Sequence, residues 1–107
     1  MDLDESTFLG RLRGGDDDAF ATLVHQYGGR MLATARRLLR SEEDAKDAVQ
    51  EAFVSAARAI DGFAGDARLS TWLHRIVMNT ALMKLRSRRR RAEEPIDDLR
   101  PRFDAEG

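Results

Sequence analysis

The sequence predicts an all-α fold, a compact bundle of three to four helices, on the strength of three observations. β-branched residues are sparse, and no segment alternates polar and apolar residues as a half-buried strand does. Several long segments instead repeat apolar residues every three or four positions, which is the period of a helix. The two prolines, Pro95 and Pro101, both lie near the C-terminal end, so no earlier segment is interrupted. With 107 residues, 42% of them hydrophobic, the chain has the size and composition of one small globular domain.

The first two helices are predicted from their end signals. A short helix is expected from about Glu5 to Arg13, because Gly14 and Gly15 form a good C-terminal stop. The second is expected to begin near Asp16 to Asp18, whose carboxylates suit the positive end of the helix dipole. Its apolar positions at helical spacing are Phe20, Leu23, Val24, Tyr27, Met31, Ala35 and Leu38. The Gly28-Gly29 pair predicts either a kink or a close approach of a neighbouring helix.

The third helix should open at Ser41, where Ser41-Glu-Glu-Asp44 forms a capping box, and run to about Ile60. Its expected core stripe consists of Ala45, Ala48, Val49, Ala52, Phe53, Ala56 and Ile60. The opposite face carries Asp47, Gln50, Glu51 and Arg58, with Val54 among them. An ordinary solvated face and a docking surface for a basic partner are both compatible with this pattern.

The segment from Asp61 to Arg68 is predicted to be a loop, and Ser70 or Thr71 is expected to cap a fourth helix that runs into the arginines. Its inner side should consist of Trp72, Leu73, Ile76, Val77, Thr80 and Met83. The outer stripe is Arg75, Asn79, Leu82 and Arg86, with Met78 beside it. Asparagine matches an adenine edge and arginine suits phosphate or guanine, so the stripe indicates nucleic-acid contact; a solvated helix face is the alternative.

Two features that flank the fourth helix extend this hypothesis. Phe63 lies between Gly62 and Gly65, where its ring would either close a pocket for an unstacked base or plug the end of the helical core. The run from Lys84 to Arg91 favours a phosphate-binding stripe, in which the expected contacts are Lys84, Arg86, Arg88, Arg89 and Arg90. The sequence therefore predicts a phosphate-binding stripe at the end of the fourth helix and a candidate base pocket before its start.

Charge and composition narrow the class of protein. The net charge is −1, but acids and bases are segregated, which indicates two differently charged partners. Without cysteine there is no disulfide or thiolate metal site, and no apolar run has the length of a membrane span, so we expect a soluble, cytoplasmic protein. His25 and His74 lack a matching ligand set, and no catalytic motif is recognisable. We expect no cofactor, no metal and no enzymatic activity.

Three blocks of the sequence form a recognisable set. They are Glu43-Asp-Ala-Lys-Asp-Ala-Val-Gln-Glu-Ala-Phe-Val54, Asp61-Gly-Phe-Ala-Gly-Asp66 and Ser70-Thr-Trp-Leu-His-Arg-Ile-Val-Met-Asn-Thr-Ala81. Together they resemble region two of bacterial sigma factors of the extracytoplasmic-function (ECF) class. Their order and spacing agree with the family, and the resemblance covers about Ala19 to Arg91. It implies a helical domain that binds RNA polymerase and the −10 promoter element.

The resemblance also implies roles for individual residues. Asp47, Gln50, Glu51 and Val54 match the block that docks on the clamp helices of the polymerase β′ subunit. The loop with Asp61, Phe63, Gly65 and Asp66 matches the segment that captures a flipped non-template base. Arg75 and Asn79 match the helix that reads the upstream part of the element, and the arginines after Lys84 would hold DNA phosphates.

The resemblance further predicts how the chain is organised. Residues 1–92 should form the helical domain and residues 93–107 a flexible linker, while the helix-turn-helix domain that reads the −35 element is missing. We expect an isolated monomer, controlled by an anti-sigma factor. The alternative hypothesis is a small helical protein-interaction domain whose basic end recognises no base.

Overall fold

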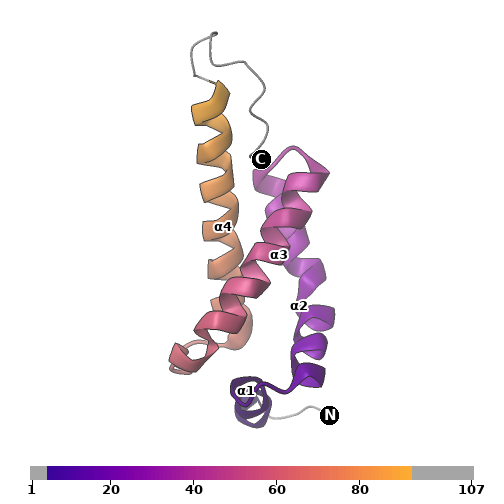
Figure 1. The fold of residues 1–107 in the computed structure, drawn as a ribbon, viewed down its shortest axis with the longest axis vertical. Coiled ribbons are helices and arrows are strands. Elements are labelled where there is room, and N and C mark those ends of the chain that lie inside the picture. The colour runs from indigo at the N-terminus through magenta and orange to yellow at the C-terminus, as the bar shows by residue number, and fades with distance from the viewer. Residues whose placement is uncertain (1–4, 93–107) are drawn as a thin grey trace.

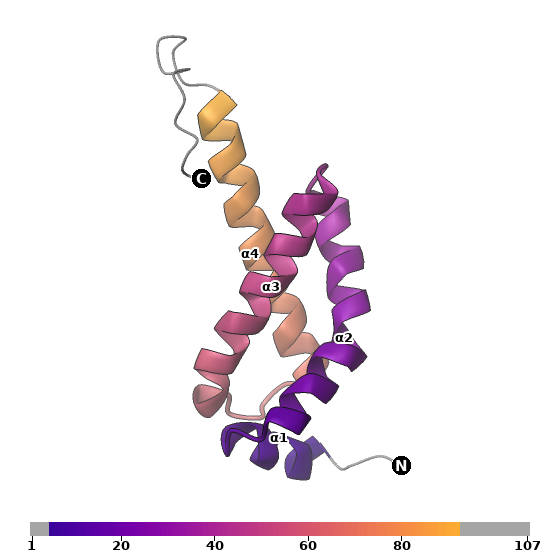
Figure 2. The same ribbon diagram turned by 45° about the vertical axis from the view of Figure 1, so that its right-hand side comes forward.

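A computed structural model describes residues 5–92 and contains four α-helices and one 3-10 turn in that range. They are α1 (Glu5–Arg13), α2 (Asp17–Leu38), α3 (Glu42–Ala59), η1 (Ile60–Gly62) and α4 (Leu69–Ala92). Helices α2, α3 and α4 run alternately up, down and up, and α1 lies across one end (Figure 1, Figure 2). The predicted all-α bundle is confirmed. The expected linker at residues 93–107 lies outside the described residues.

The starts of α2 and α3 follow the local signals in the sequence. Asp16 caps α2 by accepting hydrogen bonds from the N–H groups of Asp18 and Ala19 at 3.0 and 3.2 Å. Arg11 Nε also donates to its carboxylate at 2.8 Å, and this bond, together with the backbone bonds, lowers the pKa of Asp16. Ser41 Oγ caps α3 by accepting from the N–H of Asp44 at 3.2 Å. The Asp44 carboxylate, which the capping box would turn back onto Ser41, accepts hydrogen bonds from Arg88 instead.

The start of α4 differs from the prediction. The helix begins at Leu69, so Ser70 and Thr71 lie inside its first turn and neither is the cap. The N–H of Leu69 donates to Glu5 Oε2 of α1 at 2.8 Å. A carboxylate at the positive end of a helix satisfies an N–H that has no partner within the helix. A residue 64 positions away thus takes the role expected of a local hydroxyl.

The core lies where α2, α3 and α4 meet. Its largest fully buried side chains are Leu23, Leu69, Leu73 and Val77. The expected stripe of α3 is confirmed, since its alanines, Phe53 and Ile60 are buried and Val49 packs against the core. Small alanine side chains allow neighbouring helices to approach closely.

Three details of the packing bear on the predictions. Helix α2 is continuous through Gly28, where an added Cβ would lie 3.9 Å from Phe53 Cε2, so the glycine faces a neighbouring helix. Val24 and Met83 were expected in the core, but they are 38% and 64% exposed. Met83 belongs to the half of α4 that runs toward the open end of the bundle, where fewer helices surround it (Figure 1).

Candidate nucleic-acid interface

The outer face of α3 presents the expected polar set to solvent. Asp47, Gln50 and Glu51 are exposed, and Val54, one turn after Gln50 and Glu51, is 50% exposed. The buried alanines on the opposite side fix the rotation of α3, so this face cannot turn inward without emptying the core. An exposed aliphatic side chain ringed by carboxylates and an amide suits a partner that offers an apolar contact among cations.

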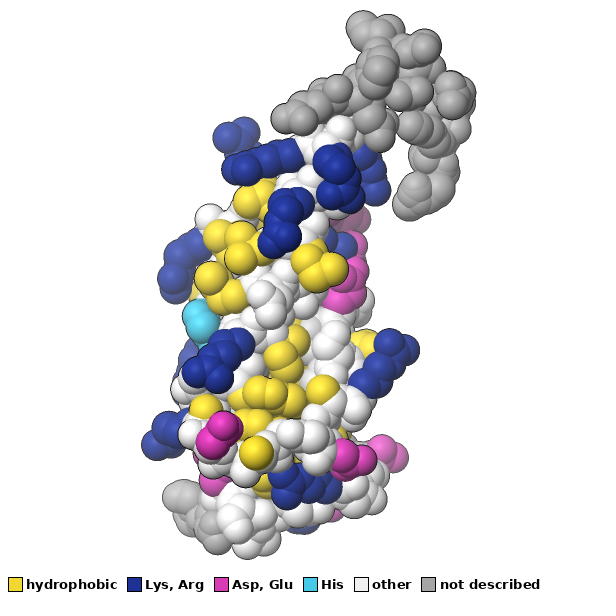
Figure 3. All heavy atoms as spheres, turned by 90° about the vertical axis from the view of Figure 1, so that its left-hand side faces the viewer, with side chains coloured by type: hydrophobic (Ala, Val, Ile, Leu, Met, Phe, Trp, Pro, Cys, Tyr) yellow, Lys and Arg dark blue, Asp and Glu magenta, His cyan; other side chains and the backbone are white. Residues whose placement is uncertain are grey.

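The expected stripe of α4 is also exposed. Arg75, Asn79 and Arg86 are exposed, while Met78 and Leu82 beside them are half-buried. In Figure 3, which faces α4, basic side chains gather toward its C-terminal end and hydrophobic side chains lie between them. Leu73 and Val77 anchor the opposite side of the helix in the core. The polar groups of the stripe are thereby held on a rigid support.

The basic end of α4 is divided between paired and unpaired side chains. Arg88 donates two hydrogen bonds to the carboxylate of Asp44 on α3, from Nε to Oδ2 at 2.9 Å and from Nη2 to Oδ1 at 2.5 Å. These bonds raise the pKa of Arg88 further above its ordinary value. Arg86, Arg89 and Arg90 are exposed and, within residues 5–92, pair with no carboxylate. They are among the α4 cations that are immediately available to a phosphate.

One ion pair joins the two expected surfaces. Lys84, expected to contact DNA, donates to Glu51 Oε2 at 2.9 Å, and Glu51 belongs to the expected polymerase surface. Lys84 is the more covered partner, with a side chain 24% exposed against 55% for Glu51. Both residues line a hollow of about 280 Å³ between α3 and α4, together with Met83 and Ser87. The two surfaces are therefore adjacent.

The loop between η1 and α4 differs from an open base pocket. Phe63 is 4% exposed, and its ring lies against Trp72 with centroids 4.8 Å apart and an interplanar angle of 34°. Of the two alternatives for Phe63, the structure shows the ring plugging the end of the core. Asp61, Gly65 and Asp66 are exposed, and Gly65 has φ of 81°, a conformation that disfavours side chains.

Sequence reasoning missed Arg13 as a residue of this region. Its guanidinium donates Nε to the carbonyl of Ile60 at 3.4 Å and Nη2 to the carbonyl of Phe63. Its separations from these residues are 47 and 50 positions, and no local pattern signals such contacts. Arg13 and Glu5 together bring α1 to both ends of the loop.

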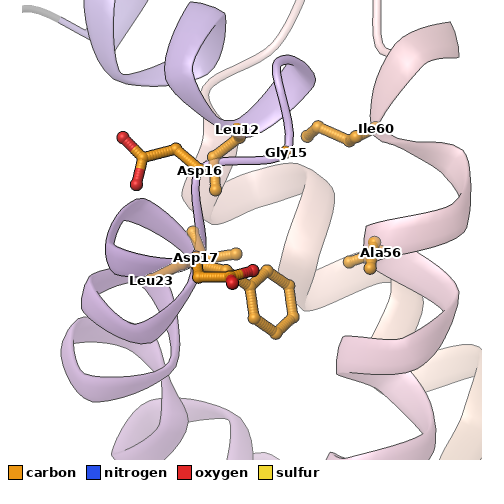
Figure 4. Close-up of a pocket in the computed structure, with 9 residues that line it drawn as sticks. Leu12, Gly15, Asp16, Asp17, Leu23, Ala56 and Ile60 are labelled. Carbon is orange, nitrogen blue, oxygen red and sulfur yellow. The ribbon is translucent and has the colours of Figure 1, made fainter.

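A further hollow, of about 250 Å³, lies between the α1–α2 turn and the end of α3 (Figure 4). Its walls include Leu12, Phe20 and Ile60, and none of the predicted site residues lines it. The Asp16 carboxylate points away from the apolar wall in Figure 4 and is engaged by Arg11 and the α2 cap. In the described part of the chain no group of acidic or histidine side chains is placed to hold a metal, and no helix there is both long and apolar enough for a bilayer.

Comparison with known proteins decides the family. Residues 23–91 match the family model of Sigma-70 region 2. The chain belongs to this family. The resemblance seen in the sequence blocks is thereby confirmed. Helix α1 and the first turns of α2 precede the matched residues.

The relatives of this region-2 domain are sigma factors. The ECF RNA polymerase sigma factor SigM of Mycobacterium tuberculosis is 40% identical over 87 residues, which cover 81% of this chain and 44% of that protein. The RNA polymerase sigma-H factor of Pseudomonas aeruginosa is 42% identical, with 76% and 42% covered. The ECF RNA polymerase sigma-E factor of Escherichia coli is 42% identical, with 74% and 41% covered. The chain thus spans less than half the length of these relatives.

A solved structure with the same fold carries a nucleic acid. It is the NMR structure of an engineered region 2 of sigmaE in complex with GTAAAA. The TM-score is 0.77 and the sequence identity 39%, with 86% of this chain and 96% of that chain covered.

Proposed function

We propose that this domain serves transcription initiation, by binding core RNA polymerase and holding the −10 promoter element as a single strand. The observation that carries the proposal is the exposed Asn79, flanked by Arg75 and Arg86 on a helix anchored in the core, in a chain whose structural relative binds GTAAAA. An amide can read an adenine edge, and the guanidinium groups can bind the backbone on either side.

The polymerase contact is assigned to the outer face of α3. Asp47, Gln50, Glu51 and Val54 offer an apolar centre with an acidic border, and the proposed partner is the pair of clamp helices of the β′ subunit. Opposite charges at such a rim guide association, while burial of the apolar centre gives affinity. The proposal therefore requires basic residues around an apolar contact on the partner.

The strand contact is assigned to α4 and the loop. Extruding a base from the duplex costs a few kcal/mol of lost stacking, and a pocket that holds the base recovers part of that cost. Phe63 packed on Trp72 supports the loop from beneath, so Asp61, Gly65 and Asp66 are the groups offered to a base. In this proposal the domain binds the separated strand after the duplex has melted, and the polymerase carries out the chemistry.

Regulation and place of action follow from these partners. A protein such as an anti-sigma factor that covers the outer face of α3 or the stripe of α4 would block one of the two contacts. The two proposed partners, core RNA polymerase and promoter DNA, are both found in the bacterial cytoplasm. We therefore propose that this domain acts there. We expect the isolated domain to act as a monomer.

The first test measures strand binding. The domain should bind a labelled GTAAAA single strand more tightly than its duplex or a scrambled strand, by fluorescence anisotropy. Asn79→Ala should weaken binding to GTAAAA by about ten-fold, because a bidentate base contact contributes roughly 1–3 kcal/mol of discrimination. Gln26→Ala removes an exposed amide from α2 and should change nothing. Equal affinity for scrambled strands would favour the alternative, an interaction domain with a basic end and no base recognition.

A second prediction separates two adjacent arginines. Arg88→Ala should lower the free energy of unfolding by about 1 kcal/mol, since it breaks the forked pair with Asp44, while the salt dependence of strand binding stays unchanged. Arg89→Ala should leave stability unchanged and make the slope of log K against log salt shallower by about 0.7. Urea denaturation and anisotropy titrations measure both. An equal loss of slope in the two variants would mean that Arg88 leaves Asp44 to bind phosphate.

A further inference from the structure

We infer that α1 positions the base-capturing loop, and that Arg13 and Glu5 are positioning residues for base recognition. This inference rests on the proposed function, because it assumes that the loop holds a base. Its structural part stands on three hydrogen bonds between α1 and the loop ends. Most of the described chain outside α1 falls within the family match, whereas α1 precedes it.

Arg13 holds the first end of the loop. It donates to the carbonyls of Ile60 and Phe63, which open and follow the turn η1. The Ile60 carbonyl also accepts the N–H of Phe63 at 3.2 Å, so η1 is closed by both bonds. Carbonyls at the end of a helix carry partial negative charge and keep a lone pair that no helical N–H uses, so a cationic guanidinium is a suitable donor to them. Fixing the Phe63 carbonyl also fixes the ring that packs on Trp72.

Glu5 holds the second end. Its carboxylate accepts the N–H of Leu69, the first residue of α4. Residues 64–68 are therefore a short span between two points that are both attached to α1. Helix α1 is itself seated in the core through Phe8, Leu9 and Leu12, which are at most 8% exposed. The attachment points are rigid for that reason.

This arrangement predicts that loss of Arg13 or Glu5 reduces selectivity for the captured base more than it reduces the attraction to DNA phosphates. A pocket whose walls are already ordered loses less conformational entropy when a base enters it, and that saving is realised only for the base that the pocket holds. Arg13 has its donors turned to backbone carbonyls, so its loss leaves the exposed cations of α4 in place. Non-specific attraction to phosphates should therefore persist when base capture is impaired.

The chain offers a matched control in Arg11. It lies on the same helix, carries the same charge and is exposed, but it donates to Asp16 and not to the loop. A general effect of charge or of α1 stability should appear in Arg11→Ala as well as in Arg13→Ala. Arg13→Lys keeps the charge but replaces the planar guanidinium, whose Nε and Nη2 donate to the two carbonyls, with a compact ammonium, and it should rescue the loss only in part.

The first readout does not involve DNA. Trp72 is the single tryptophan of the chain and packs against Phe63, so acrylamide quenching of its fluorescence reports on opening of the loop. We expect quenching to increase in Arg13→Ala and in Glu5→Ala, and to match the wild type in Arg11→Ala. Glu5→Gln keeps an oxygen acceptor for Leu69 and should lie between the wild type and Glu5→Ala.

The second readout is an abasic scan of the GTAAAA strand with the full chain. In the wild type, removal of the captured base should weaken binding by about ten-fold, because the polar contacts to that base are lost. In Arg13→Ala that loss should shrink to about two-fold, with the salt slope unchanged. Arg11→Ala should retain the wild-type profile.

The outcomes are distinguishable. Wild-type quenching and a wild-type abasic profile in Arg13→Ala would overturn the inference, as would equal changes in Arg11→Ala. If no abasic position matters even in the wild type, base capture itself is wrong and the proposed function fails at that point. If Arg13→Ala does not fold, the comparison of Glu5→Ala with Glu5→Gln decides by the same two readouts.

Discussion

Replacing Gln50 and Glu51 together by alanine is expected to weaken association with core RNA polymerase by at least about 30-fold. Both residues are exposed on the outer face of α3, beside the half-exposed Val54, so the change removes the polar contacts that border the apolar centre of the proposed docking surface. A combined loss of about 2 kcal/mol for the pair, the size of one hot-spot truncation, corresponds to roughly this factor. Anisotropy of the labelled domain, titrated with core polymerase, measures the change.

The ion pair between Glu51 and Lys84 adds a second expectation for the same variant. Without Glu51, Lys84 loses its partner and becomes available to phosphate, so affinity for the single strand should stay constant or rise by about two-fold. Asp17→Ala with Gln26→Ala removes an acid and an amide from α2 and serves as the control. Unchanged polymerase binding would contradict the docking face. A parallel loss of strand binding would show that the two surfaces cannot be separated.

Leu73→Ala is expected to lower the free energy of unfolding by about 3 kcal/mol, within the 2–5 kcal/mol typical of such changes. Leu73 is 1% exposed and lies in the core with Leu23, Leu69 and Val77, so its removal leaves a cavity that rigid helices cannot readily fill. Because small domains have only roughly 5–15 kcal/mol of stability, the variant should unfold at a much lower urea concentration.

The control for this variant lies on the same helix. Leu82 is half-buried on the stripe, and Leu82→Ala should lower the free energy of unfolding by about 1 kcal/mol, in proportion to the smaller apolar area it covers. Urea denaturation with an unchanged m value measures both variants. A loss at Leu73 no larger than that at Leu82 would contradict the placement of Leu73 in the tightly packed core.

Much of the fold and part of the site were predictable because they depend on local signals. Asp16 and Ser41 cap their helices as short-range patterns predict, since the bonded N–H groups lie two or three residues away. The alanine stripe of α3 and the Leu73–Val77 side of α4 are set by helical period, which also fixes what points outward. Exposure of Glu51 and Asn79 follows from the same period, and the sequence blocks identified the family.

Only the tertiary structure decided how those faces meet. Phe63 packs on Trp72 at the end of the core. Glu5 accepts the first N–H of α4, and Arg13 donates to the loop. Lys84 and Arg88 form ion pairs with carboxylates of α3. The polar contacts among these join residues 33 to 64 positions apart, and helical period carries no information over such distances. Periodicity determines which side of a helix faces inward. Which carboxylate reaches which cation depends on how the helices are placed against one another, and that placement results from packing the whole core at once.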